Sequence, residues 1–263
     1  MTEKTISLEI NGRVYEAREG ETILNVARRA GIEIPTLCHH DAVEPAGACR
    51  LCLVEITHSD WKGWKGLVTS CLYPVEEGLQ VTTDNEEILK ARRTVLDLLA
   101  ARCPGSDVIA DLAARYGLKR TSFRKAKIAT TCILCGLCVR VCAVKGCNAI
   151  NTAGRGILKR IAIPFKKPPV DCIGCASCAH ICPTNTIRYE DKGDQRKIWG
   201  RTFEMVTCGQ CGKPILPEVQ AEYEASKAGL GIEYFRTCPA CTRENTVETI
   251  SSAFDMKKAG LAD

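Results

Sequence analysis

Residues 132–142 read CILCGLCVRVC, and residues 172–183 read CIGCASCAHICP. In both stretches, two, two and three residues separate consecutive cysteines. The first four are Cys132, Cys135, Cys138 and Cys142, and each recurs 40 positions later as Cys172, Cys175, Cys178 and Cys182. Four matches at one offset are hard to obtain by chance. The sequence therefore predicts an internal repeat within residues 128–190, in a domain that spans residues 128–200.

The repeat has the spacing of the bacterial run that binds two [4Fe–4S] clusters. There, three cysteines of one loop bind one cluster, and the fourth binds the other. We therefore expect one cluster on Cys132, Cys135, Cys138 and Cys182, and a second on Cys172, Cys175, Cys178 and Cys142. Zinc explains the even spacing poorly, because tetrahedral sites favour two close pairs. Cys147 could replace Cys142, but the three-residue gap favours Cys142, so we interpret Cys147 as structural.

Cysteine is abundant throughout the chain, with 18 among 263 residues, and only 5% of residues are aromatic. No secretory signal and no apolar run of 18 residues is visible, which predicts a cytoplasmic protein without direct membrane insertion. Disulfides are rare in that reducing compartment, so metal binding is the favoured role of the thiols.

A separate set of four cysteines precedes the repeat: Cys38, Cys49, Cys52 and Cys71. Four thiolates can hold a [2Fe–2S] cluster, and the small residues Gly47 and Ala48 let backbone N–H groups approach the sulfurs. Zinc is the alternative, although it usually binds two tight pairs. His39 and His40 could act as ligands or tune the cluster, and we favour loop histidines at its rim.

The first 83 residues show the pattern of a compact α+β domain. Alternating residues around Asn11-Gly12 predict a hairpin over residues 5–17, and Ile23–Ala30 is expected to form a helix. Further strands are predicted at 51–57, 67–70 and 79–83. Residues 84–127 then resemble a helical linker. Asp84 and Glu87 suggest a capping box at the start of its first helix, which runs to about Arg102, and a second helix is expected over 107–116.

Three short motifs resemble a known family: PTLC at 35–38, GACRLC at 47–52 and TSC at 69–71. They are similar to the N-terminal ferredoxin domain of the complex I large peripheral subunit, of the diaphorase iron–sulfur subunit of NAD-linked hydrogenases, and of iron-only hydrogenases. The resemblance implies a β-grasp fold over residues 1–83. The family usually continues with a histidine-ligated [4Fe–4S] site. Residues 96–118 contain Cys103 but no histidine, so we expect that cluster to be absent and Cys103 to be a buried thiol.

The last module, residues 201–263, is bracketed by two Cys-x2-Cys pairs, with a predicted helix over 218–228 between them. The pairs are Cys208/Cys211 and Cys238/Cys241. Two such pairs favour a zinc-ribbon-like site that staples a module with little core, and a further [4Fe–4S] cluster is the alternative.

Charge is unevenly distributed, with fourteen basic and two acidic residues over 101–170. This excess could balance anionic clusters or form a partner-facing surface. A nucleic-acid-binding protein that uses the zinc module is a less favoured possibility, because residues 171–263 are not basic.

No nucleotide-binding glycine motif and no catalytic residue set stands apart from the cysteines. We therefore predict an electron-transfer subunit without an active site of its own. The resemblance implies two partners: a flavin-containing NAD(P)H dehydrogenase subunit, which would carry FMN or FAD, and a catalytic or bifurcating redox subunit. A freely diffusing ferredoxin-like carrier and an enzyme with a hidden site are the alternatives.

Overall fold

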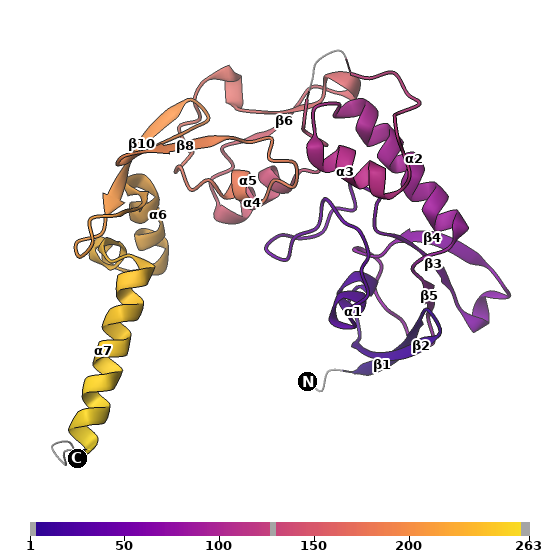
Figure 1. Cartoon of the computed structure of the whole chain (residues 1–263), viewed down its shortest axis with the longest axis horizontal. Helices are drawn as coiled ribbons and strands as arrows, with labels where there is room; N and C mark the ends of the chain where they lie inside the picture. Colours follow the sequence, from indigo (N-terminus) through magenta and orange to yellow (C-terminus); the bar gives the residue numbers. More distant parts are fainter. Residues whose placement is uncertain (1–3, 127–129, 259–263) are drawn as a thin grey trace. The chain divides into compact units, whose positions relative to one another are not determined.

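The computed structural model describes residues 4–126 and 130–258 (Figure 1). The chain forms two compact units. The first comprises Met1–Gly146, Ile150–Ala162 and Cys178–Ile187, and the second comprises Cys147–Ala149, Ile163–Ser177 and Arg188–Asp263. Both contain helices and strands, so the expected mixture is confirmed. The division into domains at residues 83, 127 and 200 stays a prediction, and the boundary at 127/128 lies outside the described residues.

The first unit opens with the predicted hairpin, β1 (Thr5–Ile10) and β2 (Arg13–Arg18). Its two turn residues, Asn11 and Gly12, have φ angles of 52° and 79°. A type I′ turn requires positive φ at both positions, and asparagine and glycine tolerate it best. The hairpin is therefore fixed by local sequence.

Three more strands complete a five-stranded sheet in the order β2-β1-β5-β3-β4. They are β3 (Leu53–Thr57), β4 (Lys65–Thr69) and β5 (Gln80–Thr82), and the short helix η1 (Ser59–Trp61) connects β3 to β4. The strands β1 and β5 run parallel, and the other neighbours are antiparallel. The helix α1 (Ile23–Arg29) packs its apolar side into the same core as the strands. That core includes Ile6, Leu8, Ile10, Ile23, Leu24, Val26, Val54, Ile56 and Val81.

Two helices, α2 (Glu86–Arg102) and α3 (Asp107–Arg115), follow the sheet and pack against each other (Figure 1). The expected helices are confirmed, but the cap at Asp84 is wrong by one residue. Asn85 has extended backbone, and its side chain accepts a hydrogen bond from the Ile88 N–H at 2.8 Å. Asparagine performs this role as well as aspartate, so the sequence offered two equivalent caps side by side.

Arg92 on α2 joins this helix to the sheet. Its side chain is buried and donates to the carbonyl oxygens of Leu51, Leu53 and Thr83 at 3.1, 2.7 and 3.0 Å. Leu51 lies inside the first cysteine loop. The guanidinium therefore positions that loop while satisfying three buried acceptors.

Short elements occupy the repeat region: α4 (Leu137–Lys145), β6 (Asn151–Ala153), η2 (Gly156–Leu158), β7 (Arg160–Ala162), η3 (Pro164–Lys166) and α5 (Ser177–His180). The strand β7 is only three residues long. Left-handed backbone at Gly156 (φ 53°) and Phe165 (φ 52°) produces the turns that confine it.

The second unit contains an antiparallel sheet in the order β11-β10-β9-β8. Its strands are β8 (Tyr189–Lys192), β9 (Gln195–Ile198), β10 (Arg201–Thr207) and β11 (Pro214–Pro217). The predicted helix α6 (Glu218–Ala228) is confirmed and packs against β10 and β11. The short helix η4 (Ile232–Arg236) and the helix α7 (Pro239–Lys258) follow. Within the described residues, no helix has the length and hydropathy needed to cross a bilayer.

The cap at Asn85 gives a direct test of the α2 start. We expect Asn85→Ala to lower the free energy of unfolding of the first unit by about 1 kcal/mol, because the Ile88 N–H loses its acceptor. Asp84→Ala is the matched control and should change it by less than about 0.5 kcal/mol. Urea denaturation followed by circular dichroism measures both. The assignment is contradicted if Asp84→Ala is the more damaging change.

Candidate metal centres

The first cysteine set comes together from three loops of the first unit. Cys38 follows α1, Cys49 and Cys52 precede β3, and Cys71 follows β4, and all four are buried. The Cys49 N–H donates to the Cys38 sulfur at 3.3 Å, and the sulfurs of Cys52 and Cys71 share a hydrogen bond at 3.3 Å. The tight loop depends on left-handed backbone at Gly47 and Arg50, with φ of 58° and 59°.

These four thiols cannot all ionise by themselves. A side-chain hydrogen bond between the two thiols lowers the pKa of Cys49 to about 6, whereas that side-chain bond and burial raise the pKa of Cys38. The second pair behaves alike: Cys71 lowers the pKa of Cys52 to about 7, and its own pKa rises. Repulsion from Cys38 and Cys49 raises the pKa of Cys71 further. A positive centre is therefore needed before all four become thiolates.

A buried hydroxyl beside this set fits such a centre. Ser70 is fully buried, and its Oγ makes no hydrogen bond of good geometry within the described part of the chain, although it faces the Cys52 thiol and helps to lower its pKa. Buried hydroxyls almost always find a partner. Ser70 precedes Cys71, and a hydroxyl donor next to cluster sulfur is a familiar way to stabilise the extra electron. The residues present thus fit an iron–sulfur centre.

The two halves of the repeat have the same local backbone. Leu134 and Gly174 occupy equivalent positions and are both left-handed, with φ of 56° and 73°, and so are Gly136 and Ala176, with φ of 74° and 56°. The two loops thus share one pattern of backbone conformation. Each loop then enters a helix one residue before its third cysteine.

The first set expected from the repeat lies within the first unit. Repulsion from the thiolates of Cys182 and Cys132 acts on the pKa of Cys135, which indicates that these three thiols are near one another although Cys182 is distant in sequence. Burial raises the pKa of Cys138 to about 12. Burial also acts to raise the pKa of Cys182, but backbone N–H groups outweigh it and lower the pKa. One of them, on Thr186, donates to the Cys182 sulfur at 3.3 Å. These four thiols are therefore close enough to affect one another's pKa, and their common cluster stays a prediction.

The second set expected from the repeat is divided between the units. Cys142 on α4 and Cys178 on α5 belong to the first, and Cys172 and Cys175 to the second. Their common cluster stays a prediction from the spacing. In the second unit, Arg201 donates to the carbonyl oxygens of Pro169, Val170 and Cys172 at 2.9, 2.7 and 2.8 Å, which fixes the start of that loop.

Four other residues considered in the sequence analysis, two cysteines and two histidines, have the following contacts. Cys103 is buried, its pKa is raised to about 11 by burial, and its sulfur donates to the Cys132 carbonyl at 3.1 Å. The His39 ring contacts Arg28 Nη1 at 3.2 Å, and His40 Nδ1 accepts from the Ala42 N–H at 3.1 Å. Cys147 is half-buried in the second unit.

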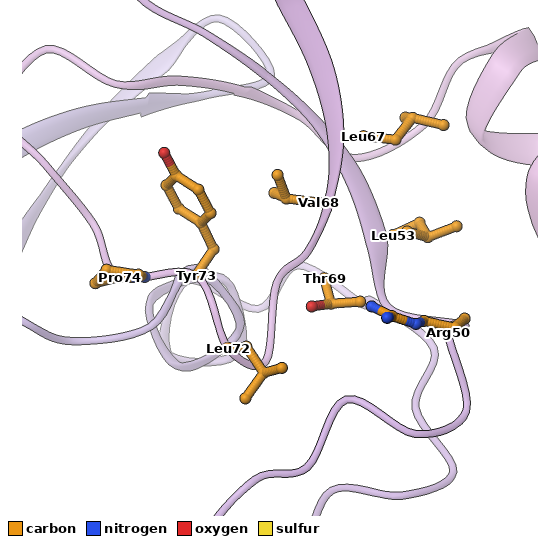
Figure 2. A pocket seen from close by; sticks show the side chains of 8 residues that line it. All are labelled: Arg50, Leu53, Leu67, Val68, Thr69, Leu72, Tyr73 and Pro74. Atoms are coloured by element: carbon orange, nitrogen blue, oxygen red, sulfur yellow. The ribbon is translucent and has the colours of Figure 1, made fainter.

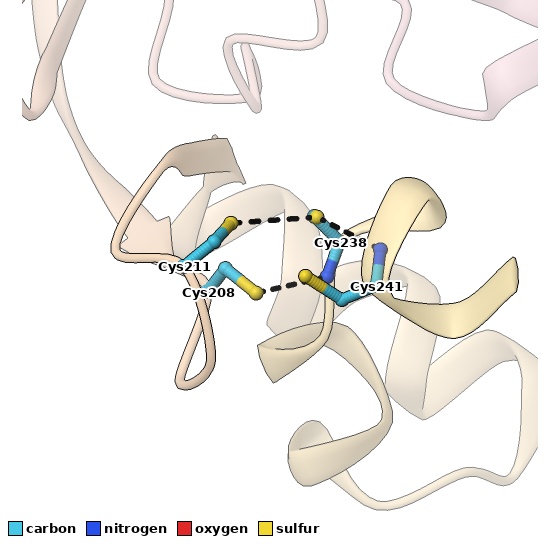
Figure 3. Close-up of side chains that lie close together, drawn as sticks. All are labelled: Cys208, Cys211, Cys238 and Cys241. Carbon is cyan, nitrogen blue, oxygen red and sulfur yellow. Dashed lines mark hydrogen bonds between the residues drawn. The ribbon is translucent and has the colours of Figure 1, made fainter. Parts of the chain in front are cut away.

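The four C-terminal cysteines form a tight group (Figure 3). Cys208 and Cys211 lie between β10 and β11, Cys238 immediately precedes α7, and Cys241 lies in its first turn. All four sulfurs lie within 4.8 Å of one another, and those of Cys211 and Cys238 are 3.7 Å apart. The local core consists of three of these cysteines with Ile215 against them. This site could hold one metal ion or an iron–sulfur cluster.

Hydrogen bonds also shift the pKa values of these thiols in opposite directions. Backbone N–H groups, first that of Cys211, lower the pKa of Cys208 to about 6, and the Cys238 N–H reaches its sulfur at 3.3 Å. The hydrogen bond with Cys238 raises the pKa of Cys241 to about 12. The Cys208 thiolate is thus available near neutral pH, whereas Cys241 needs a cation to ionise.

A shallow pocket of about 320 Å³ lies beside the first cysteine set (Figure 2). Its walls are mostly apolar and come from β3, β4 and the loops around them. They include Arg50, next to Cys49, and Leu72, next to Cys71. Both side chains are exposed, so the covering of this site is thin on one side.

Comparisons with known proteins agree with the motifs. Residues 3–86 match the family described as a 2Fe-2S iron-sulfur cluster binding domain. The chain is 30% identical over 230 residues to the NADPH-Fe(3+) oxidoreductase subunit alpha of Geobacter sulfurreducens, which covers 78% of this chain and 26% of that protein. It is 33% identical over 175 residues to the NADH-ubiquinone oxidoreductase 75 kDa subunit of Reclinomonas americana, which covers 57% of this chain and 25% of that protein.

A solved structure of an NAD+-reducing [NiFe]-hydrogenase in the H2-reduced state is also similar. It has a TM-score of 0.61 and 29% identity, and the match covers 69% of this chain and 86% of that one. The resemblance to complex I and NAD-linked hydrogenase subunits is therefore confirmed. The chain spans about a quarter of the length of the curated relatives named above.

Replacing Cys103 tests whether it is a ligand. We expect Cys103→Ala to keep the full iron content and to lose about 1 kcal/mol of stability with the hydrogen bond to Cys132. Cys132→Ala is the control and should lose about four irons. Anaerobic iron analysis with thermal denaturation measures both. Loss of about four irons from Cys103→Ala would contradict this interpretation.

The metal affinity of the C-terminal group should fall as the pH falls, and it should fall more steeply below about pH 6. Binding removes the Cys241 proton below about pH 12, so affinity falls by at least about tenfold for each unit of falling pH. Below about pH 6 the Cys208 thiolate is also protonated, and the slope should steepen by a further tenfold per unit. Competition with a chelator from about pH 5 to pH 8 measures this. Cys147→Ser should behave as wild type, and a pH-independent affinity would contradict the account.

Proposed function

We propose that this chain is an electron-transfer subunit of a multisubunit oxidoreductase. It passes single electrons through one [2Fe–2S] and two [4Fe–4S] centres, between a flavin-containing NAD(P)H dehydrogenase subunit and another redox or catalytic subunit. The main observation in support is that two ligand sets share one apolar core. Cys38 and Cys49 are buried together with Ile133, next to Cys132, and Cys135 packs against the same core. Electrons can cross such a dry contact without a diffusing carrier.

The ligand assignment follows the sets described above. Cys38, Cys49, Cys52 and Cys71 hold the [2Fe–2S] centre, and the sheet order with α1 against it supports a β-grasp fold there. The first [4Fe–4S] centre is held by Cys132, Cys135, Cys138 and Cys182. The second is held by Cys172, Cys175, Cys178 and Cys142, which is supported by the matching backbone of the two loops.

Iron–sulfur centres supply reversible one-electron storage, and the residues around them set the potentials. N–H groups of Cys49, Leu134 and Thr186 donate to ligand sulfurs at 3.3, 3.4 and 3.3 Å. Each donor stabilises the more negative, reduced state. Burial excludes water, which keeps the electron on the relay.

Zinc is the metal that we propose for the C-terminal group. Four sulfurs at about 2.3 Å from one tetrahedral ion lie about 3.8 Å apart. The 3.7 Å between the Cys211 and Cys238 sulfurs agrees with this value. A [4Fe–4S] cluster binds each sulfur to a different iron and spreads the four further apart. The role of zinc here is to complete a module that has almost no apolar core.

Anaerobic metal analysis with EPR tests the cofactors. We expect about ten irons and one zinc per chain, with both [2Fe–2S] and [4Fe–4S] signals after dithionite reduction. Cys208→Ser should lose the zinc and keep the iron. About fourteen irons without zinc would contradict the zinc assignment, and an iron-free protein would contradict the function.

Partner dependence tests the place in the complex. We expect the chain to copurify with a flavoprotein, and NAD(P)H to reduce its clusters only when that flavoprotein is present. Reduction of the purified chain alone by NAD(P)H would point to a hidden active site. A monomer that exchanges electrons freely with many proteins would favour a diffusing carrier.

A further inference from the structure

Arg140 on α4 binds the two ligand sets of the first unit at the same time. Its Nη2 donates to the Cys38 carbonyl at 2.9 Å and to the Cys135 carbonyl at 3.3 Å. Its Nη1 donates to the Glu44 carbonyl, in the same loop as Cys38. The Nη2 atom alone therefore connects the backbone of a [2Fe–2S] ligand, Cys38, to that of a [4Fe–4S] ligand, Cys135.

The repeat itself does not require arginine at this position. The equivalent residue of the second half, 40 positions later, is His180, which is exposed. Arg140 is therefore explained by its contact with the Cys38 loop and not by the folding of the cysteine motif. The rigid fork of a guanidinium suits this role, because its donors diverge in one plane toward separate acceptors.

One donor of this guanidinium is left over. The Nε of Arg140 is buried and has no hydrogen-bond partner among the described residues. A charged donor in that position is costly unless a negative group faces it. Clusters with four thiolate ligands are anionic, so the positive charge of Arg140 is balanced when the centres on both sides are loaded.

We propose that Arg140 is a positioning residue for electron exchange between the [2Fe–2S] centre and the first [4Fe–4S] centre. It holds the two ligand loops at a fixed separation and stabilises the reduced state of both centres through its charge. In each exchange one centre loses one electron as the other gains it, so no further oxidant or reductant is needed. This inference rests on the proposed function and deepens it.

The test uses the full chain, loaded with iron and reduced anaerobically with dithionite. Arg140→Met removes the charge and all three hydrogen bonds but keeps a long side chain. Arg140→Lys keeps the charge and loses the fork. The matched control is Arg93→Met, because Arg93 is exposed and donates to a single carbonyl, that of Tyr116, at 3.0 Å. Cys135→Ala, which lacks the neighbouring centre, marks the limit of no interaction.

In the wild type, we expect the [2Fe–2S] EPR signal to relax faster than in Cys135→Ala, because a second paramagnetic centre lies close by. Arg140→Met should weaken this effect, lower the midpoint potentials of both centres and slow electron exchange between them by about tenfold, as changes beyond the ligands typically do. Arg140→Lys should weaken the interaction but keep the potentials. Arg93→Met should match the wild type in each measurement.

Unchanged relaxation and potentials in iron-replete Arg140→Met would overturn the proposal, even if its melting temperature fell. If that variant loses iron, Arg140→Lys decides by relaxation alone, and unchanged relaxation in it would overturn the proposal. If both lose the first [4Fe–4S] centre while Arg93→Met keeps it, Arg140 only retains the cluster and the proposal is wrong. Equal relaxation in wild type and Cys135→Ala also overturns it. A wild type without iron would instead contradict the proposed function.

Discussion

Thiols held within a few ångströms of one another oppose each other's ionisation, and this constraint shapes the cysteine groups at both ends of the chain. In the pair Cys52 and Cys71, one pKa falls to about 7 while the other rises. In the C-terminal group, backbone N–H groups lower the pKa of Cys208 to about 6, and the hydrogen bond with Cys238 raises that of Cys241 to about 12. A cationic centre removes the conflict, because it replaces the protons. Metal loading therefore completes these sites and, in the C-terminal group, most of the local core.

The first unit shows how such sites become a relay. The loop around Cys38 and Cys49, the helices α2 and α3, and the loop around Ile133 share one apolar core. In related proteins we expect a histidine-ligated cluster in the stretch that α2 and α3 occupy here, and residues 96–118 contain no histidine. Leu96 and Ile109 are fully buried there. The Cys103 sulfur, between α2 and α3, donates to the Cys132 carbonyl.

Features fixed by neighbours in sequence could be predicted. The turn at Asn11-Gly12, the helix over 218–228 and the repeat of the cysteine loops all follow from local preference and spacing. The cap at Asn85 was missed because two equally good caps are adjacent. Contacts between distant residues could not be foreseen, since no local pattern signals that Arg92 or Arg140 converges on several carbonyls. The opposite pKa shifts of paired thiols could not be foreseen either, because they depend on which thiols meet in the folded chain.

Mössbauer spectroscopy of the oxidised chain, prepared anaerobically with ⁵⁷Fe, tests most directly whether the cysteine sets bind iron–sulfur clusters. The account predicts two components, with about one fifth of the iron in a [2Fe–2S] centre and the remainder in [4Fe–4S] centres. Iron present only as isolated ions in tetrahedral sulfur sites, or a single cluster type, would contradict it.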